Sequence, residues 1–199
     1  IDKERRHMRK PLRLLVIATV LVAAILLPIT ATAANPHLKG QNPVSFTDNG
    51  LTLSATVNYA GLGNFDTLQV LTASGNTAST CTNNGGNQAP GQNPAPVTVA
   101  GATPVPAGDI KNGNVTISTT TNAPVSPVPG APGCPNSGWT ENITNVFFTS
   151  ATIRLFQDQT AASGDFGRWE TLVLTVNCTF SPPTSNGAVP SSGFSCTTA

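Results

Sequence analysis

Residues 51–59 alternate strictly between apolar and polar side chains, and no other feature limits the possible folds so strongly. The odd positions hold Leu, Leu, Ala, Val and Tyr, whereas Thr, Ser and Asn occupy the even positions. Successive side chains of a β-strand point to opposite faces, so a period of two predicts a strand with one buried face. The same pattern would scatter the apolar residues around a helix.

Several other segments predict strands, and none after residue 33 has a helical period. The expected strands cover residues 44–46, 66–74 (with Leu68 and Val70 on one face), 97–102, 115–121, 139–157 (two strands with a bend near residues 149–150) and 172–180. Asn49-Gly50 and Asn112-Gly113 are turn pairs that tolerate positive φ. Gly and Pro form about a fifth of residues 34–199, which disfavours long helices. The sequence therefore predicts an all-β chain with a single antiparallel immunoglobulin-like β-sandwich of about seven or eight strands.

The first 33 residues have the features of a secretory signal peptide. A basic stretch that ends at Arg13 precedes an apolar run over residues 14–27, and Ala31-Thr32-Ala33 supplies a small-x-small cleavage pattern. Because the first methionine is Met8, residues 1–7 are expected to lie upstream of the true start. The alternative is an uncleaved anchor, since residues 14–34 carry no charge and about 20 residues span a bilayer.

The rest of the chain divides into three parts. Residues 34–42 form a polar segment that leads into the first strand, and residues 43–180 form the sandwich domain. Residues 181–199 form a tail rich in Pro, Ser and Thr. Within the domain, residues 82–96 and 123–138 are expected to be long loops, because Asn, Gly and Pro dominate them.

All four cysteines follow the leader, which agrees with export to an oxidising compartment. Four cysteines allow three pairings. We favour Cys81–Cys134 and Cys178–Cys196, because the second pair closes the tail onto the last strand. On this view the second bridge orders only a tail, and its loss should matter less to global stability. Zinc is the alternative use of these residues, but no Cys-x-x-Cys pair is present.

The charge balance argues against a nucleic-acid partner. Six of the ten Lys and Arg lie in the leader, which leaves four cations against seven acids and a net charge of −3 after residue 33. Binding to nucleic acid needs clustered cations that displace counterions from phosphates. Membrane contact is expected only through the leader before cleavage, and the sequence does not define the oligomeric state.

The sequence offers little for catalysis, and we expect no catalytic residue, metal or cofactor. His37 is the only histidine after the leader, and it lies close to the expected cleavage point. Asp158, Asp165 and Glu170 form the densest acidic group, but Arg154 and Arg168 flank it, which favours surface ion pairs. The alternatives for these acids are a pair of catalytic carboxylates and a calcium site, although the spaced Asp ladder of calcium loops is missing.

Trp139 and Trp169 are the only tryptophans, and each opens an expected strand. Exported β-sandwiches can bind sugars by stacking them on an exposed ring, so either residue is a candidate ligand platform. The alternative is that both cap the ends of the sandwich core.

Turn and cysteine motifs carry a resemblance to known proteins. Cys81-Thr82-Asn83-Asn84-Gly85-Gly86-Asn87, Lys111-Asn112-Gly113-Asn114 and Cys134-Pro135-Asn136 ahead of Trp139, together with the leader, resemble uncharacterised secreted β-sandwich proteins of bacteria, of the immunoglobulin-like type. The resemblance covers most of the chain after the leader and implies a Cys81–Cys134 bridge. It implies no activity.

These observations predict a secreted, extracellular protein rather than an enzyme. Its expected role is structural or adhesive, at the cell surface or in the extracellular matrix, with an extracellular polymer or protein as the partner. One alternative is a glycan- or cell-wall-binding module that uses Trp139 or Trp169. A second alternative is a secreted hydrolase that uses Asp158, Asp165 and Glu170.

Overall fold

The computed structural model describes residues 35–90, 96–125, 134, 136, 138–158 and 171–199. The leader, its cleavage site and the expected start at Met8 lie outside the described residues. In the described part of the chain, no helix is long and apolar enough to cross a membrane. Ala33–Ala199 form one compact unit, and the regular structure of its described residues consists of strands and two short 3₁₀ turns, Ala107–Asp109 and Ser191–Gly193.

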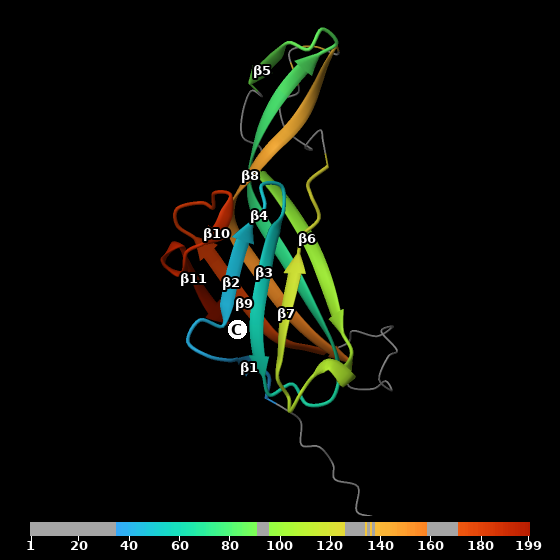
Figure 1. Cartoon of the computed structure of the whole chain (residues 1–199), viewed down its shortest axis with the longest axis vertical. Helices are drawn as coiled ribbons and strands as arrows, with labels where there is room; N and C mark the ends of the chain where they lie inside the picture. Colours follow the sequence, from blue (N-terminus) through green and yellow to red (C-terminus); the bar gives the residue numbers. More distant parts are fainter. Residues whose placement is uncertain (1–34, 91–95, 126–133, 135, 137, 159–170) are drawn as a thin grey trace, which may run out of the picture. The chain divides into compact units, whose positions relative to one another are not determined.

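The first sheet is antiparallel and is built around one central strand, β3. Its strands are β1 (His37–Leu38), β2 (Val44–Asp48), β3 (Leu53–Ala60), β7 (Val115–Thr120) and β10 (Gly187–Val189). β3 pairs with β1 and β2 along one edge and with β7 along the other, since Val57 has both Val44 and Ile117 as register partners. β10 extends the sheet beyond β2. Figure 1 shows β2, β3 and β7 side by side as one layer.

The second sheet is also antiparallel and contains the two longest strands. Its strands are β4 (Asp66–Asn83), β5 (Gln88–Pro90), β6 (Pro96–Val105), β8 (Trp139–Asp158), β9 (Thr171–Phe180) and β11 (Phe194–Thr198). The order is β11-β9-β8-β4, and both β5 and β6 pair with the far edge of β4. The predicted all-β architecture with two antiparallel sheets is confirmed.

The β4–β8 ladder extends beyond the strands that flank it. β6 accompanies β4 only as far as Asn76, and β9 accompanies β8 only from Ser150 onward. The remaining part of β4 and β8, with β5, forms a narrow arm (Figure 1). The sequence predicted a strand that ends at residue 74, before Gly75-Asn76, and two strands in 139–157, but both β4 and β8 run through as continuous strands.

A close backbone approach explains why the expected break is a bulge. The register shifts between Ser74 and Gly75, so that Thr149 on β8 is the extra residue. A Cβ on Gly75 would lie 2.4 Å from the carbonyl oxygen of Phe147. Glycine at this position therefore lets two strands approach closely, rather than ending one of them.

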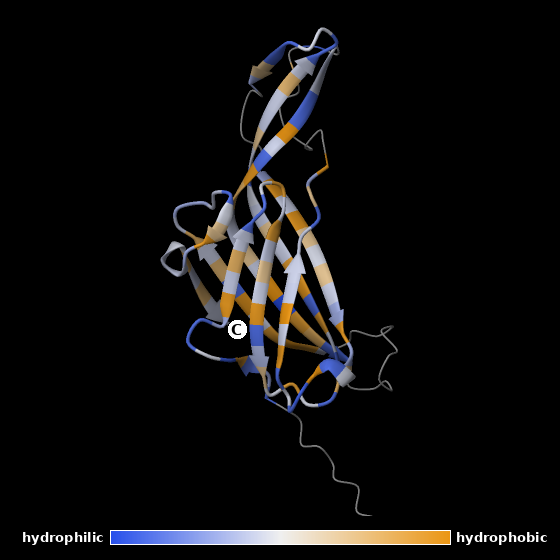
Figure 2. Cartoon of the chain, in the orientation of Figure 1, coloured by the Kyte–Doolittle hydropathy of each residue, from blue (hydrophilic) through white to orange (hydrophobic). Residues whose placement is uncertain are grey.

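The core lies between the two sheets, as the alternation predicted. Along β3, Leu53, Ala55, Val57 and Tyr59 are buried, whereas the residues between them are half-buried. Figure 2 shows the corresponding alternation of hydrophobic and hydrophilic bands on the strands of both sheets.

An aromatic cluster joins β2 of the first sheet to β9 and β11 of the second. The Phe46 ring lies edge-on, 5.0 Å from the rings of Phe180 and Phe194.

The inner face of β4 is more polar than its sequence suggests. Leu68 and Val70 do share one face, as expected, but both are only half-buried. The buried face instead carries Gln69 between Thr67 and Leu71. An amide in the core needs hydrogen-bond partners, and Gln69 has two of them within the sandwich.

Residues 181–199, expected as a tail tied by a disulfide, contribute one strand to each sheet. β10 pairs with β2, and β11 pairs with β9. Before β10, the hydroxyl of buried Thr184 donates to Asp48 and accepts from the backbone N–H of Phe148 at 3.0 Å. The expected end of the sandwich at residue 180 therefore moves to Thr198. Composition misled the prediction because edge strands tolerate many small polar residues.

Candidate functional site

A row of hydrogen-bonded polar side chains covers the outer face of β3 and β7. We call it the hydroxyl ladder, and it consists of Ser54, Thr56, Asn58, Thr116, Ser118 and Thr120. Its three cross-strand pairs are Ser54 with Thr120 at 2.8 Å, Thr56 with Ser118 at 3.0 Å, and Asn58 with Thr116 at 2.7 Å. β2 adds the exposed side chains of Ser45 and Thr47 beside this row.

The ladder follows from the period of two in both strands. The apolar residues of β3 and β7 point into the core, so the intervening polar residues must face outward. Antiparallel register then places each outward residue of β3 directly opposite one of β7. A hydroxyl has one donor and two acceptor positions, so each pair keeps hydrogen-bonding capacity for a ligand. The result is an uncharged surface of regularly spaced polar groups.

A cleft of about 410 Å³ opens at one end of the hydroxyl ladder. Its lining residues are Lys39, Gly40, Asn58, Tyr59, Lys111, Asn114, Val115 and Thr116. Asn58 and Thr116 belong to both the ladder and the cleft. The two surfaces are therefore continuous.

Two short backbone features place the lysines of this cleft. The Lys39 N–H donates to the carbonyl of Asn58 at 2.9 Å, which holds the segment after β1 against β3. Lys111 begins a tight turn in which Asn112 and Gly113 have φ of 53° and 72°. The turn closes through the bridge between Lys111 and Asn114. This confirms the turn that Asn112-Gly113 predicted.

The cleft is suited to binding rather than to proton transfer. Both lysines bring positive charge, and among the described residues no acid lines the cleft. The Lys111 ammonium also donates to the carbonyl of Gly108 at 2.5 Å. Burial raises the pKa of Tyr59, whose hydroxyl already donates to Gln69. The phenol therefore stays neutral within the core.

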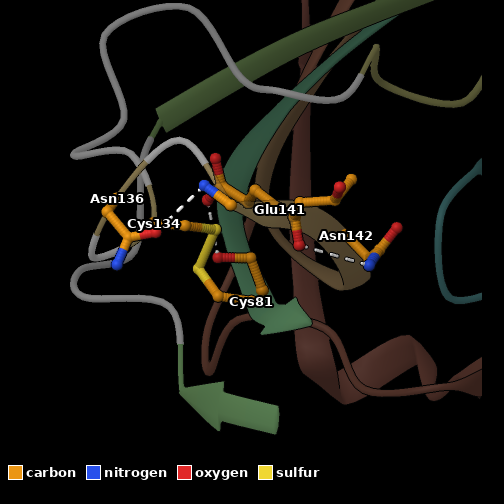
Figure 3. Close-up of a disulfide and its surroundings, with 8 residues drawn as sticks. Cys81, Cys134, Asn136, Glu141 and Asn142 are labelled. Carbon is orange, nitrogen blue, oxygen red and sulfur yellow. Dashed lines mark hydrogen bonds between the residues drawn. A yellow bond between two sulfur atoms is a disulfide. The ribbon is translucent and has the colours of Figure 1, made fainter. Parts of the chain in front are cut away.

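The arm carries the first disulfide, with the favoured pairing. Cys81 and Cys134 are joined with their Cα atoms 5.5 Å apart, and buried Glu141 lies beside the bridge (Figure 3). The Glu141 carboxylate accepts a 2.9 Å hydrogen bond from Ser79. The second favoured pair, Cys178–Cys196, joins directly opposed residues of β9 and β11.

The two tryptophans differ in what the structure describes. Trp139 is half-buried at the start of β8, opposite Asn83, on the arm. The backbone N–H of Trp139 donates to the backbone carbonyl of Asn136 at 3.1 Å. It does not line the lysine cleft. Trp169 lies outside the described residues, so its role as a ligand platform stays a prediction.

The acidic group is described only in part. Asp158 is buried at the end of β8, directly opposite buried Asp66 on β4. The Asp66 carboxylate accepts a 2.7 Å hydrogen bond from the N–H of Ala107. Asp165 and Glu170 lie outside the described residues, so the proposed carboxylate pair stays untested. Among the described residues, no group of three His, Cys, Asp or Glu could hold a metal.

His37 takes no part in the cleft. Its side chain is exposed, and Nδ1 lies 2.8 Å from the carbonyl oxygen of Asn35. Sequence reasoning missed the cleft itself, because Lys39 and Lys111 are far apart in the chain. The available signal was the Asn112-Gly113 turn, which places Lys111 at the end of β7. Nothing in the sequence pairs that turn with Lys39.

The chain matches no protein-family model, no curated protein and no solved structure.

Proposed function

We propose that the chain is a secreted, non-catalytic adhesive module of the cell surface or extracellular matrix. The observation that carries the proposal is the hydroxyl ladder, because an exposed, uncharged and regular polar face suits a polymer that is itself rich in hydroxyl groups. Each hydrogen bond to such a polymer contributes only about 1 kcal/mol, so affinity would arise from many contacts along a chain. Two disulfides support an extracellular location, where such bridges persist.

We also propose that the fold is immunoglobulin-like, and the order of the strands supports this. In that fold the second strand lies between the first and fifth, and the sixth lies between the third and seventh. Here β3 lies between β2 and β7, and β8 lies between β4 and β9, with β6 added beside β4. One departure is that neither disulfide joins β3 to β8.

A second candidate is a glycan-binding module centred on Trp139. The half-buried position of Trp139 at the start of β8, on the arm that carries the Cys81–Cys134 bridge, is the observation in favour. The hydrolase alternative keeps only Asp158 among the described residues, and that side chain is buried.

One expression experiment tests export and adhesion together. The full chain is produced in a bacterial host, and the protein in the medium is sequenced and mixed with insoluble cell-wall polysaccharide. We expect a mature N-terminus near Ala34 and retention on the polysaccharide. Retention that survives Trp139→Ala supports the ladder, whereas its loss in a folded Trp139→Ala variant supports the second candidate. A product that retains residues 14–27 contradicts the cleaved leader.

A further inference from the structure

We propose that the cleft between Lys39 and Lys111 binds the anionic groups of an acidic polysaccharide whose hydroxyl groups lie along the ladder. This inference names the ligand class of the proposed adhesive function and rests on it. The shared chemistry is a negatively charged oxygen group on a hydroxyl-rich chain, supplied by a carboxylate or by a phosphodiester. Lysine ammonium groups act as point charges that accept either group.

The distribution of charge in the described residues favours an anion at this position. Three lysines and arginines are described, and two of them line the cleft. Four of the five described acids are buried away from the surface: Asp48, Asp66, Glu141 and Asp158. The fifth is exposed Asp109, two residues before Lys111, and it does not line the cleft. The cleft is therefore a positive site on a chain with net charge −3 after residue 33.

The shape of the cleft leaves room for a ligand beside both lysines. An added Cβ at Gly40 would meet no atom within 4 Å, so the space next to Lys39 is open. Half-buried Val115 provides an apolar residue of the lining, and Asn58 and Thr116 provide polar groups at the ladder side. Sugar rings present this combination, with apolar C–H faces and hydroxyl edges.

Continuity with the ladder points to a polymer rather than a small anion. The Asn58–Thr116 pair is the last rung of the ladder and also part of the cleft wall. A chain lying along Thr56 and Ser118 would therefore pass directly into the space between the two lysines. One anionic group would be held in the cleft, and the neutral hydroxyl groups would contact the rungs.

The test compares three soluble polymers by calorimetry: a neutral glucan, a polyuronate and a poly(glycerol phosphate). The protein is the exported product of the full chain, recovered from the medium. We expect at least tenfold tighter binding to one or both acidic polymers than to the glucan in 20 mM salt. The preference should fall steeply in 0.5 M salt, because salt screens exposed charges. The polymer that binds tighter identifies the source of the anion.

Matched charge variants separate the cleft from general attraction. Lys39→Gln/Lys111→Gln should abolish the preference for acidic polymers, and Lys39→Arg/Lys111→Arg should retain it. Arg154→Gln is the control, because Arg154 is exposed on β8 in the other sheet. Asp109→Asn should strengthen binding of acidic polymers by removing a nearby negative charge.

Three results would overturn the inference. Equal binding of neutral and acidic polymers overturns the anion site and leaves the adhesive function in place. Equal losses in Arg154→Gln and in the double lysine variant also overturn it. Binding to none of the three polymers, together with no retention on cell-wall polysaccharide, overturns the adhesive function as well.

Discussion

The hydroxyl of Tyr59 on β3 donates a 2.7 Å hydrogen bond to the side-chain carbonyl of Gln69 on β4, between the two sheets. The Gln69 amide donates in turn to Thr119 on β7 at 2.8 Å, and the Thr119 hydroxyl donates to Thr103 on β6 at 2.9 Å. Four strands from both sheets are thus tied by one buried polar chain. Tyr59 is also one of the residues that line the cleft.

Tyr59→Phe should lower the free energy of unfolding by about 1–3 kcal/mol, because the carbonyl of Gln69 would stay buried without its donor. Urea denaturation measures this change. Thr56→Val is the matched control, since it removes a half-buried hydroxyl from the outer face of the same strand and should change stability by less than about 0.5 kcal/mol. Equal effects of the two substitutions would contradict the role of the buried chain.

Alkaline pH should destabilise the fold through the same residue. Burial raises the pKa of Tyr59 above its ordinary value of 10.0, so the folded state keeps the phenol protonated where the unfolded state loses the proton. The stabilisation is therefore complete below about pH 10 and declines as pH rises above it. Urea midpoints between pH 8 and pH 11 should fall for the natural protein and fall less for Tyr59→Phe. If the urea midpoints of the two proteins fell equally with pH, the decline would come from titratable groups other than Tyr59.

Thr184→Val should cost about 1–3 kcal/mol, although the position lies in the segment that composition marks as a tail. The hydroxyl serves both buried Asp48 and the N–H of Phe148, and valine keeps the shape without these bonds. Thermal unfolding of Thr184→Val and of Thr179→Val, an exposed position on β9, gives the comparison. A negligible loss in Thr184→Val would show that this segment is only loosely attached.

The two disulfides should contribute to different processes. In the chain-entropy model, closing 53 residues at Cys81–Cys134 contributes about 4 kcal/mol and closing 18 at Cys178–Cys196 about 3 kcal/mol. Cys178 lies in the core, however, whereas the first bridge lies on the arm, which can open locally. We therefore expect Cys178–Cys196 to contribute more to global stability than Cys81–Cys134, which is the opposite of the ranking predicted from the sequence.

Alanine pairs test that reversal. Cys178→Ala/Cys196→Ala should lower the melting temperature more than Cys81→Ala/Cys134→Ala does. The latter should instead increase proteolytic cleavage within residues 76–83 and 139–147. A larger drop in melting temperature for the arm variant would restore the original ranking.

Local patterns predicted the strands well where one face is apolar and the other polar. The alternation in β3 and the Asn112-Gly113 turn gave the correct strand, face and turn, because both depend only on neighbouring residues. Gly75 misled the prediction, because its role is a close approach to Phe147, a partner far along the chain. The sequence also did not predict which face of β4 is buried. Gln69 can lie in the core because its side chain forms hydrogen bonds with Tyr59 and Thr119, which belong to other strands.

The candidate site was still less visible in the sequence. Each rung of the ladder joins two strands about 60 residues apart, and the cleft adds Lys39 from the segment before β2. Serine and threonine are also common in ordinary strands, so their composition alone does not mark a surface. Only the register of β3 against β7 turns these residues into a row.

Retention on insoluble cell-wall polysaccharide, compared between two variants, tests the central proposal most directly. Thr56→Val/Ser118→Ala removes one rung of the ladder, and Ser74→Ala/Thr98→Val removes a similar exposed pair from the other sheet. The account predicts that the first variant binds at least about fivefold more weakly, which is the loss of about 1 kcal/mol, whereas the second binds like the natural protein. Equal binding by both variants would contradict an adhesive role for the ladder.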